Sequence, residues 1–122
     1  MKLFIRAYIL FCWVGTIFIL IAWPMPEYEG TVTTYYDKAA HALLFGVLSF
    51  LIFSFLSEFK RINALFAILS SFVLSALYSA FCEYVQSFVP GRDVSRYDLF
   101  AGLSGAALAC IFAYGKSIVK KS

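Results

Sequence analysis

Residues 83–105 read EYVQSFVPGRDVSRYDLFAGLSG, and this stretch decides how the rest of the chain is interpreted. Its charged and amide side chains surround the pair Pro90–Gly91, a turn signal, between two segments that are almost purely apolar. A charged group at the edge of hydrocarbon is costly unless it is paired or wetted, so such a cluster indicates a functional site. A second polar island, DKAAH at 37–41, opens another apolar segment. We expect the two islands to meet on one side of a membrane and to form the single site of the chain.

The composition is that of a membrane protein. The 122 residues are 62% hydrophobic and only 14% charged, whereas a soluble domain carries about 25% charged residues. Four apolar runs of about 20 residues are each long enough to cross a bilayer. The sequence therefore predicts an all-α, integral-membrane four-helix bundle that forms one domain over residues 1–122. The expected helices lie at about 3–23, 37–56, 62–89 and 98–115.

Several partners and compartments are excluded or disfavoured. A net charge of +3 without a basic stripe gives no indication of a nucleic-acid partner. The first apolar run resembles a secretory signal, but no small-x-small cleavage site precedes Pro24, so we expect an uncleaved spanning helix. The widely spaced Cys12, Cys82 and Cys110 lack metal-ligand spacing and are interpreted as buried free thiols.

Helical spacing predicts which faces are turned toward protein. Serines and amide or acidic residues recur at intervals of four, four, four and three in the third segment, and therefore share one helix face. We expect this polar stripe to avoid lipid. In the fourth segment, Gly105 lies on a face of small residues with Ala101 and Ala109, which lets helices approach closely. The residues of the polar stripe are Ser71, Ser75, Ser79, Glu83 and Gln86.

The distribution of Lys and Arg predicts the orientation. Four crossings place seven of these residues on the side of the termini and three, Lys38, Arg92 and Arg96, on the other side. The richer side faces the cytoplasm. Both termini are therefore expected inside and both polar islands outside. Residues 24–36 are expected to form an outer polar loop.

These motifs resemble the VanZ-like family. The resemblance rests on Asp37-Lys38-x-x-His41 and on Glu83-x-x-Gln86 followed by Pro90-Gly91-Arg92, Ser95 and Asp98-Leu99. It covers nearly the whole chain and implies a small multi-pass protein of the bacterial cytoplasmic membrane. The founding member of that family is associated with resistance to the glycopeptide antibiotic teicoplanin. The resemblance implies no particular reaction.

This chain departs from the family pattern at one position that bears on the site. The family pattern carries an asparagine four residues after the aspartate and a glycine three residues later. The corresponding residues here are Gly102 and Gly105. The chain therefore lacks an amide that could form hydrogen bonds at the expected site.

The first island offers a histidine with charged neighbours. Asp37, Lys38 and His41 can share one helical turn, so Asp37 could orient the imidazole. Asp37 also stands where a helix N-cap is expected, which is its structural alternative. His41 is interpreted either as a satisfied interfacial residue or as an acid-base group.

The second island offers a carboxylate below the membrane surface. Glu83 precedes Pro90 by about 10 Å of helix, a depth at which a carboxylate needs a partner. A salt bridge between helices and acid-base chemistry with His41 remain alternatives. Arg92 and Arg96 are expected to contact lipid phosphates. The alternative is that Arg92 makes a bidentate contact with a phosphate or carboxylate of a bound ligand. Asp98 begins the fourth helix, where its negative charge is expected either to interact favourably with the helix dipole or to pair with an arginine.

Two functions remain open from the sequence. The first is an outward-facing charged pocket that binds an anionic amphipathic envelope molecule, such as a lipid headgroup or a lipoglycopeptide such as teicoplanin. The second is an enzyme that uses Glu83 and His41 as an acid-base pair on a lipid-linked or cell-wall substrate. Four helices disfavour a proton-coupled transporter, unless the chain forms a homo-oligomer. No cofactor is expected, and a metal site built from His41, Glu83 and Asp98 is not required by the spacing. The remaining predicted ligand-binding residues are Asp37, Lys38, Gln86, Arg92, Ser95 and Asp98.

Overall fold

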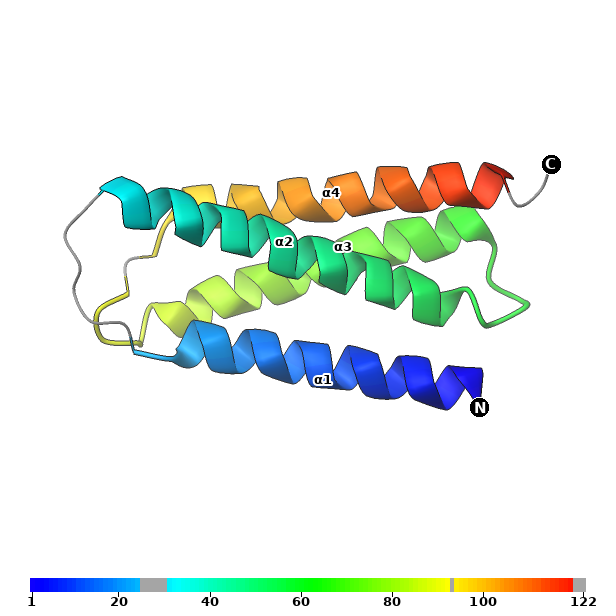
Figure 1. The fold of residues 1–122 in the computed structure, drawn as a ribbon, viewed down its shortest axis with the longest axis horizontal. Helices are drawn as coiled ribbons and strands as arrows, with labels where there is room; N and C mark the ends of the chain where they lie inside the picture. The colour runs from blue at the N-terminus through cyan, green and yellow to red at the C-terminus, as the bar shows by residue number, and fades with distance from the viewer. Residues whose placement is uncertain (25–30, 93, 120–122) are drawn as a thin grey trace.

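The computed structural model describes residues 1–24, 31–92 and 94–119, and for 31–34 only the backbone. It contains four helices, α1 (Lys2–Ala22), α2 (Thr31–Leu56), α3 (Ala64–Gln86) and α4 (Arg96–Val119). Each helix is long and apolar enough to span a membrane, and the described residues form no strand. The prediction of an all-α, four-helix membrane protein is confirmed. The start of α1 and the end of α4 lie at the same end of the bundle (Figure 1), whereas the side that faces the cytoplasm stays a prediction from the Lys and Arg count.

The second helix begins earlier than the sequence suggested. It starts at Thr31 and not at Asp37, so part of the expected loop at 24–36 is helical, while its residues 25–30 lie outside the described residues. The run Thr31–Tyr36 is polar but contains no helix breaker, so its polarity alone does not distinguish a loop from a helix. The N-cap role expected for Asp37 is therefore wrong, because Asp37 lies inside the helix.

The other boundaries differ by a few residues, for local reasons. The side chain of Asn63 caps α3 by accepting a hydrogen bond from Phe66 N at 2.8 Å, which sets its start at Ala64. After Gln86 the chain tightens into i→i−3 bonds, such as Val89 N to Gln86 O at 3.0 Å, and Pro90 prevents the helix from continuing. Gly91 follows with φ 76°, a conformation that favours glycine. The fourth helix extends in both directions beyond the expected 98–115.

The most extensive contact joins α2 and α4, and it depends on glycine. A Cβ atom added to Gly105 would overlap the carbonyl group of Ala42, and one added to Gly46 would lie 3.1 Å from Gly105 O. The two backbones are thus closer than any side chain would permit. The predicted close approach of a small-residue face is confirmed.

The first helix is held against α2 and α3. Trp13 Nε1 donates to Leu44 O at 3.1 Å, and Tyr78 Oη donates to Val14 O at 2.9 Å. Such bonds satisfy polar side chains inside hydrocarbon. Cys82 is buried and Cys110 half-buried, but Cys12 on α1 is exposed, so the expectation that all three thiols are buried is wrong for Cys12. The apolar core consists of Ile17, Ile21, Phe45, Leu48, Ile52 and Cys82.

Candidate functional site

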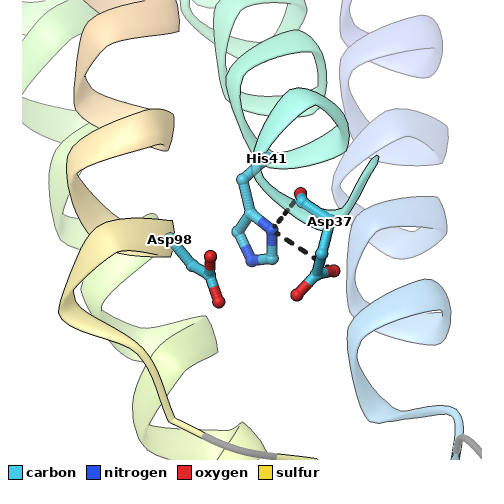
Figure 2. Close-up of side chains that lie close together, drawn as sticks. All are labelled: Asp37, His41 and Asp98. Carbon is cyan, nitrogen blue, oxygen red and sulfur yellow. Dashed lines mark hydrogen bonds and ion pairs between the residues drawn. The ribbon is translucent and has the colours of Figure 1, made fainter. Parts of the chain in front are cut away.

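Four side chains from three helices meet at the end of the bundle opposite the start of α1, and we call them the carboxylate–histidine cluster. Asp37 and His41 come from α2, Glu83 from α3 and Asp98 from α4. His41, Glu83 and Asp98 are buried, with 2%, 7% and 4% of their surfaces exposed, whereas the Asp37 side chain is 38% exposed. Figure 2 shows the carboxylates of Asp37 and Asp98 on either side of the His41 ring. The expected convergence of the two polar islands is therefore present in the structure.

The His41 ring is oriented by its own helix. Its Nδ1 lies 2.9 Å from the backbone carbonyl oxygen of Asp37 and 3.8 Å from Oδ1 of the same residue. A carbonyl oxygen only accepts hydrogen bonds, so Nδ1 is the donor and carries a proton. The other nitrogen, Nε2, lies 3.4 Å from Glu83 Oε1. The imidazole therefore presents Nε2 to the carboxylate of α3.

The polar atoms at the centre of the cluster are buried without hydrogen bonds. His41 Nε2 and both carboxylate oxygens of Glu83 have no hydrogen-bond partner. The backbone amide of Ser95 faces Glu83 but does not reach hydrogen-bond geometry. Buried polar groups are nearly always satisfied in folded proteins. These atoms therefore indicate a place that a proton, a cation or a ligand group would fill.

Asp98 brings a third carboxylate to the same place. It interacts electrostatically with Asp37, His41 and Lys38. One ligand atom from each of Asp37, His41 and Asp98 lies within 4.8 Å of the other two, which is a grouping suited to a metal ion. The metal site considered from the sequence consists of His41, Glu83 and Asp98, whereas the grouping in the structure has Asp37 in place of Glu83.

Arg92 is engaged inside the protein. Its Nη1 lies 3.5 Å from Asp37 Oδ1, and its Nη2 donates to the carbonyl oxygen of Leu20 at 2.9 Å. The guanidinium group therefore ties the turn after α3 to α1 and α2. It pairs with Asp37 and not with Glu83 or Asp98, as considered from the sequence. Its Nε has no hydrogen-bond partner, and a contact with a ligand stays a prediction.

The remaining predicted site residues line the same end of the bundle. The Lys38 ammonium group lies 5.8 Å from the centre of the Tyr97 ring, a cation–π distance. Gln86 is buried one turn after Glu83. The Ser95 hydroxyl accepts a hydrogen bond from Tyr97 N at 3.3 Å and so caps α4. Arg96 is exposed.

The polar stripe of α3 is buried, as expected, and continues from the cluster into the bundle. Ser71, Ser75 and Ser79 are almost fully buried, and Ser75 Oγ donates to Phe45 O at 3.0 Å. Ser79 Oγ has no partner, and a Cβ at Gly102 would lie 2.8 Å from it. The position where the family pattern has asparagine is thus filled by its neighbours and offers no room for an amide.

One residue at the far end of the stripe, Ser49 of α2, was missed from the sequence. Ser49 is buried, and its hydroxyl lies 3.5 Å from the thiol of Cys110 on α4, which the sequence analysis interprets as a free thiol. Ser49 is a single small polar residue in an apolar run, without a periodic companion, so no sequence signal marks it.

Two cavities lie away from the carboxylate–histidine cluster. A groove of about 320 Å³ between α1, α2 and α3 is almost entirely apolar, with Leu10, Leu48 and Tyr78 among its lining residues. Another of about 400 Å³ lies where α3 begins and α4 ends, beside Asn63 and Tyr114. Neither is lined by any residue of the carboxylate–histidine cluster.

The fold and the cluster define a class: a small multi-pass membrane protein with ionisable side chains enclosed between its helices. The model of the VanZ/LLP1 family matches residues 4–119, nearly the whole chain. The chain belongs to the VanZ/LLP1 family, and the resemblance seen in the motifs is confirmed. No curated protein and no solved structure gives a significant match.

Proposed function

We propose that the carboxylate–histidine cluster and the cationic residues around it bind the polar headgroup of an anionic amphipathic envelope molecule. The molecule would be a lipid or a lipoglycopeptide such as teicoplanin, at the outer surface of the bacterial cytoplasmic membrane. The observation that carries the proposal is the pair His41 Nε2 and Glu83 Oε1, 3.4 Å apart and buried without hydrogen-bond partners. Ionisable groups inside a membrane protein are expensive and usually serve function.

The surroundings of the cluster suit an amphipathic ligand. Lys38, Arg92 and Arg96 supply positive charge at this end of the bundle, where a phosphate or carboxylate of a headgroup would lie. Exposed aromatic rings, those of Tyr84, Phe88 and Tyr97, stand on α3, the following turn and α4. Aromatic rings favour the boundary between headgroups and hydrocarbon. The ligand would thus place its charge at the cluster and its chains along the bundle.

Lipid retention tests this proposal. The full chain, purified in detergent and exposed to an equimolar mixture of phosphatidylglycerol and phosphatidylcholine, should retain phosphatidylglycerol when examined by native mass spectrometry. Arg92→Gln should reduce this preference by about tenfold, because it removes a charged hydrogen-bond donor from the headgroup phosphate. Arg6→Gln, at an arginine at the other end of the bundle that pairs with Glu58 at 3.0 Å, is the matched control and should leave it unchanged. Equal retention of both lipids, or loss in both variants alike, would contradict the proposal.

Catalysis is the second candidate, and the same pair of side chains favours it. A buried carboxylate beside an oriented imidazole is the arrangement of general acid-base chemistry, which contributes about 10²–10⁴-fold to a rate. Teicoplanin and lipid-linked cell-wall precursors incubated with the protein should keep their masses if the site only binds. A new product that disappears with Glu83→Gln would establish an enzyme in place of a binding protein.

A further inference from the structure

We propose that the carboxylate–histidine cluster holds a divalent transition-metal cation, with Asp37, His41 and Asp98 as ligands and Glu83 beside His41. The inference rests on the proposed function in one respect, since the cation would give a carboxylate-rich cluster its affinity for an anionic headgroup. The ion site itself stands on geometry alone. The ion would sit at the end of the bundle where α2 and α4 begin, between these two helices (Figure 2).

The orientation of His41 is that of a metal-binding histidine. Such residues usually donate their second ring N–H to a backbone carbonyl or carboxylate, which fixes the tautomer and aims the free nitrogen at the ion. Nδ1 of His41 makes this bond to Asp37 O at 2.9 Å. Nε2, buried and without a hydrogen-bond partner, is the free nitrogen. The ring is therefore already arranged to donate an electron pair.

The distances agree with a coordination sphere. Ligands bound at about 2.1 Å lie roughly 3.0–3.4 Å apart when adjacent and about 4.2 Å apart when opposite. The separation of 3.4 Å between His41 Nε2 and Glu83 Oε1 fits adjacent ligands without movement. One ligand atom each from Asp37, His41 and Asp98 lies within 4.8 Å of the other two, but the Asp37 carboxylate lies nearest to Nδ1, at 3.8 Å, so it must swing toward Nε2 to share an ion with it. Asp37, whose side chain is partly exposed, has room for that adjustment.

The charges around the cluster also favour a cation. Three carboxylates, those of Asp37, Glu83 and Asp98, share this region with Lys38 and Arg92 among the described residues. Arg92 reaches Asp37, and Lys38 acts on Asp98, whereas the groups that face Glu83 are the His41 ring and the backbone amide of Ser95. Carboxylates so close together repel, and their burial is costly without compensation. A divalent ion supplies that compensation where the oxygens of Asp37 and Asp98 approach the His41 ring.

The ligand types select the class of ion. Carboxylates alone suit Mg²⁺ and Ca²⁺, whereas an imidazole shifts the preference toward Zn²⁺, Mn²⁺ and similar ions. Two or three carboxylates and one imidazole leave coordination positions open. A phosphate or carboxylate oxygen of the headgroup could occupy them. The competing occupant is a proton shared between His41 and Glu83, and the experiment separates the two.

Direct ion binding tests the inference without any lipid. The full chain in detergent, stripped with EDTA and dialysed against Zn²⁺ or Mn²⁺, should bind one ion per chain, and Mg²⁺ at the same concentration should not displace it. Asp98→Asn and His41→Gln should each weaken binding by at least tenfold, as even second-layer partners of metal ligands do. Glu58→Gln should bind as the parent does. Asp37→Asn, at a partly exposed and so more tolerant side chain, should show the same loss if Asp98→Asn fails to fold.

The two outcomes are distinguishable from those of the lipid experiment. No ion bound at 1:1, or binding that is unchanged in all three cluster variants, would overturn the metal site and leave a proton as the occupant. Stoichiometric ion binding without retention of phosphatidylglycerol would leave the metal site standing and refute the proposed function. Retention of the lipid after EDTA treatment would support headgroup binding and contradict the role given to the ion.

Discussion

Gly105→Ala is expected to destabilise the protein more than the same substitution at Gly46 or Gly102. The added Cβ would overlap the backbone carbonyl of Ala42, which no rotamer change can relieve. Overpacking usually costs about 1–3 kcal/mol and more where backbone must move, so we expect a loss near the upper end of this range. The free energy of unfolding in mixed micelles, titrated with SDS, measures the effect.

Gly115→Ala provides a matched control on the same helix. Nothing lies within 4 Å of a Cβ placed there, and alanine favours helix over glycine by about 1 kcal/mol. This variant should therefore be as stable as the parent or slightly more stable. Equal unfolding free energies for the two variants would show that α2 and α4 do not approach each other at Gly105.

The pair His41 and Glu83 should show a large coupling free energy. His41→Leu or Glu83→Leu alone leaves the other polar side chain buried among apolar groups, at a cost of about 1–3 kcal/mol. The double variant His41→Leu/Glu83→Leu removes both polar groups together and should recover much of that loss. The unfolding free energies of the four proteins give a coupling of about 1–3 kcal/mol. The double variant should also lose ion binding although it recovers stability, so the two measurements distinguish the role of the pair in binding from its role in stability.

The ion pair between Arg6 and Glu58, at the other end of the bundle, is a reference for the coupling free energy of His41 and Glu83. Arg6 and Glu58 lie 3.0 Å apart but keep about a third of their side-chain surfaces exposed. Exposed pairs contribute about 0–1 kcal/mol, so Arg6→Leu and Glu58→Leu should be nearly additive. A coupling for His41 and Glu83 no larger than this value would mean that the two side chains do not meet.

Periodicity and composition were enough to predict the helices and the polar face of α3. The stripe from Ser71 to Gln86 is visible because helical spacing puts its residues on one face, whatever that face contacts. The convergence of His41 and Glu83 was also predictable, because neither is tolerable alone in hydrocarbon. These inferences need only the local geometry of a helix and the cost of burying charge.

Other features depend on how the helices are rotated and shifted against one another, which no local pattern records. The partner of Arg92 is Asp37 and the carbonyl of Leu20, a choice that follows from the height of the turn relative to α1. Gly105 was recognised as an interface residue, but its contact, Ala42, was not. The start of α2 at Thr31 was missed because polar residues at a membrane surface can be helical or looped.

The tautomer and environment of His41 test the central claim most directly, because it is the only histidine in the chain. With ¹⁵N-labelled histidine, two-bond ¹H–¹⁵N spectra report both ring nitrogens without assignment. We expect a proton on Nδ1 and ring signals that shift in Glu83→Gln and Asp98→Asn, but not in Glu58→Gln. A ring whose nitrogens give the same signals in all four proteins and exchange freely with water would contradict the enclosed carboxylate–histidine cluster.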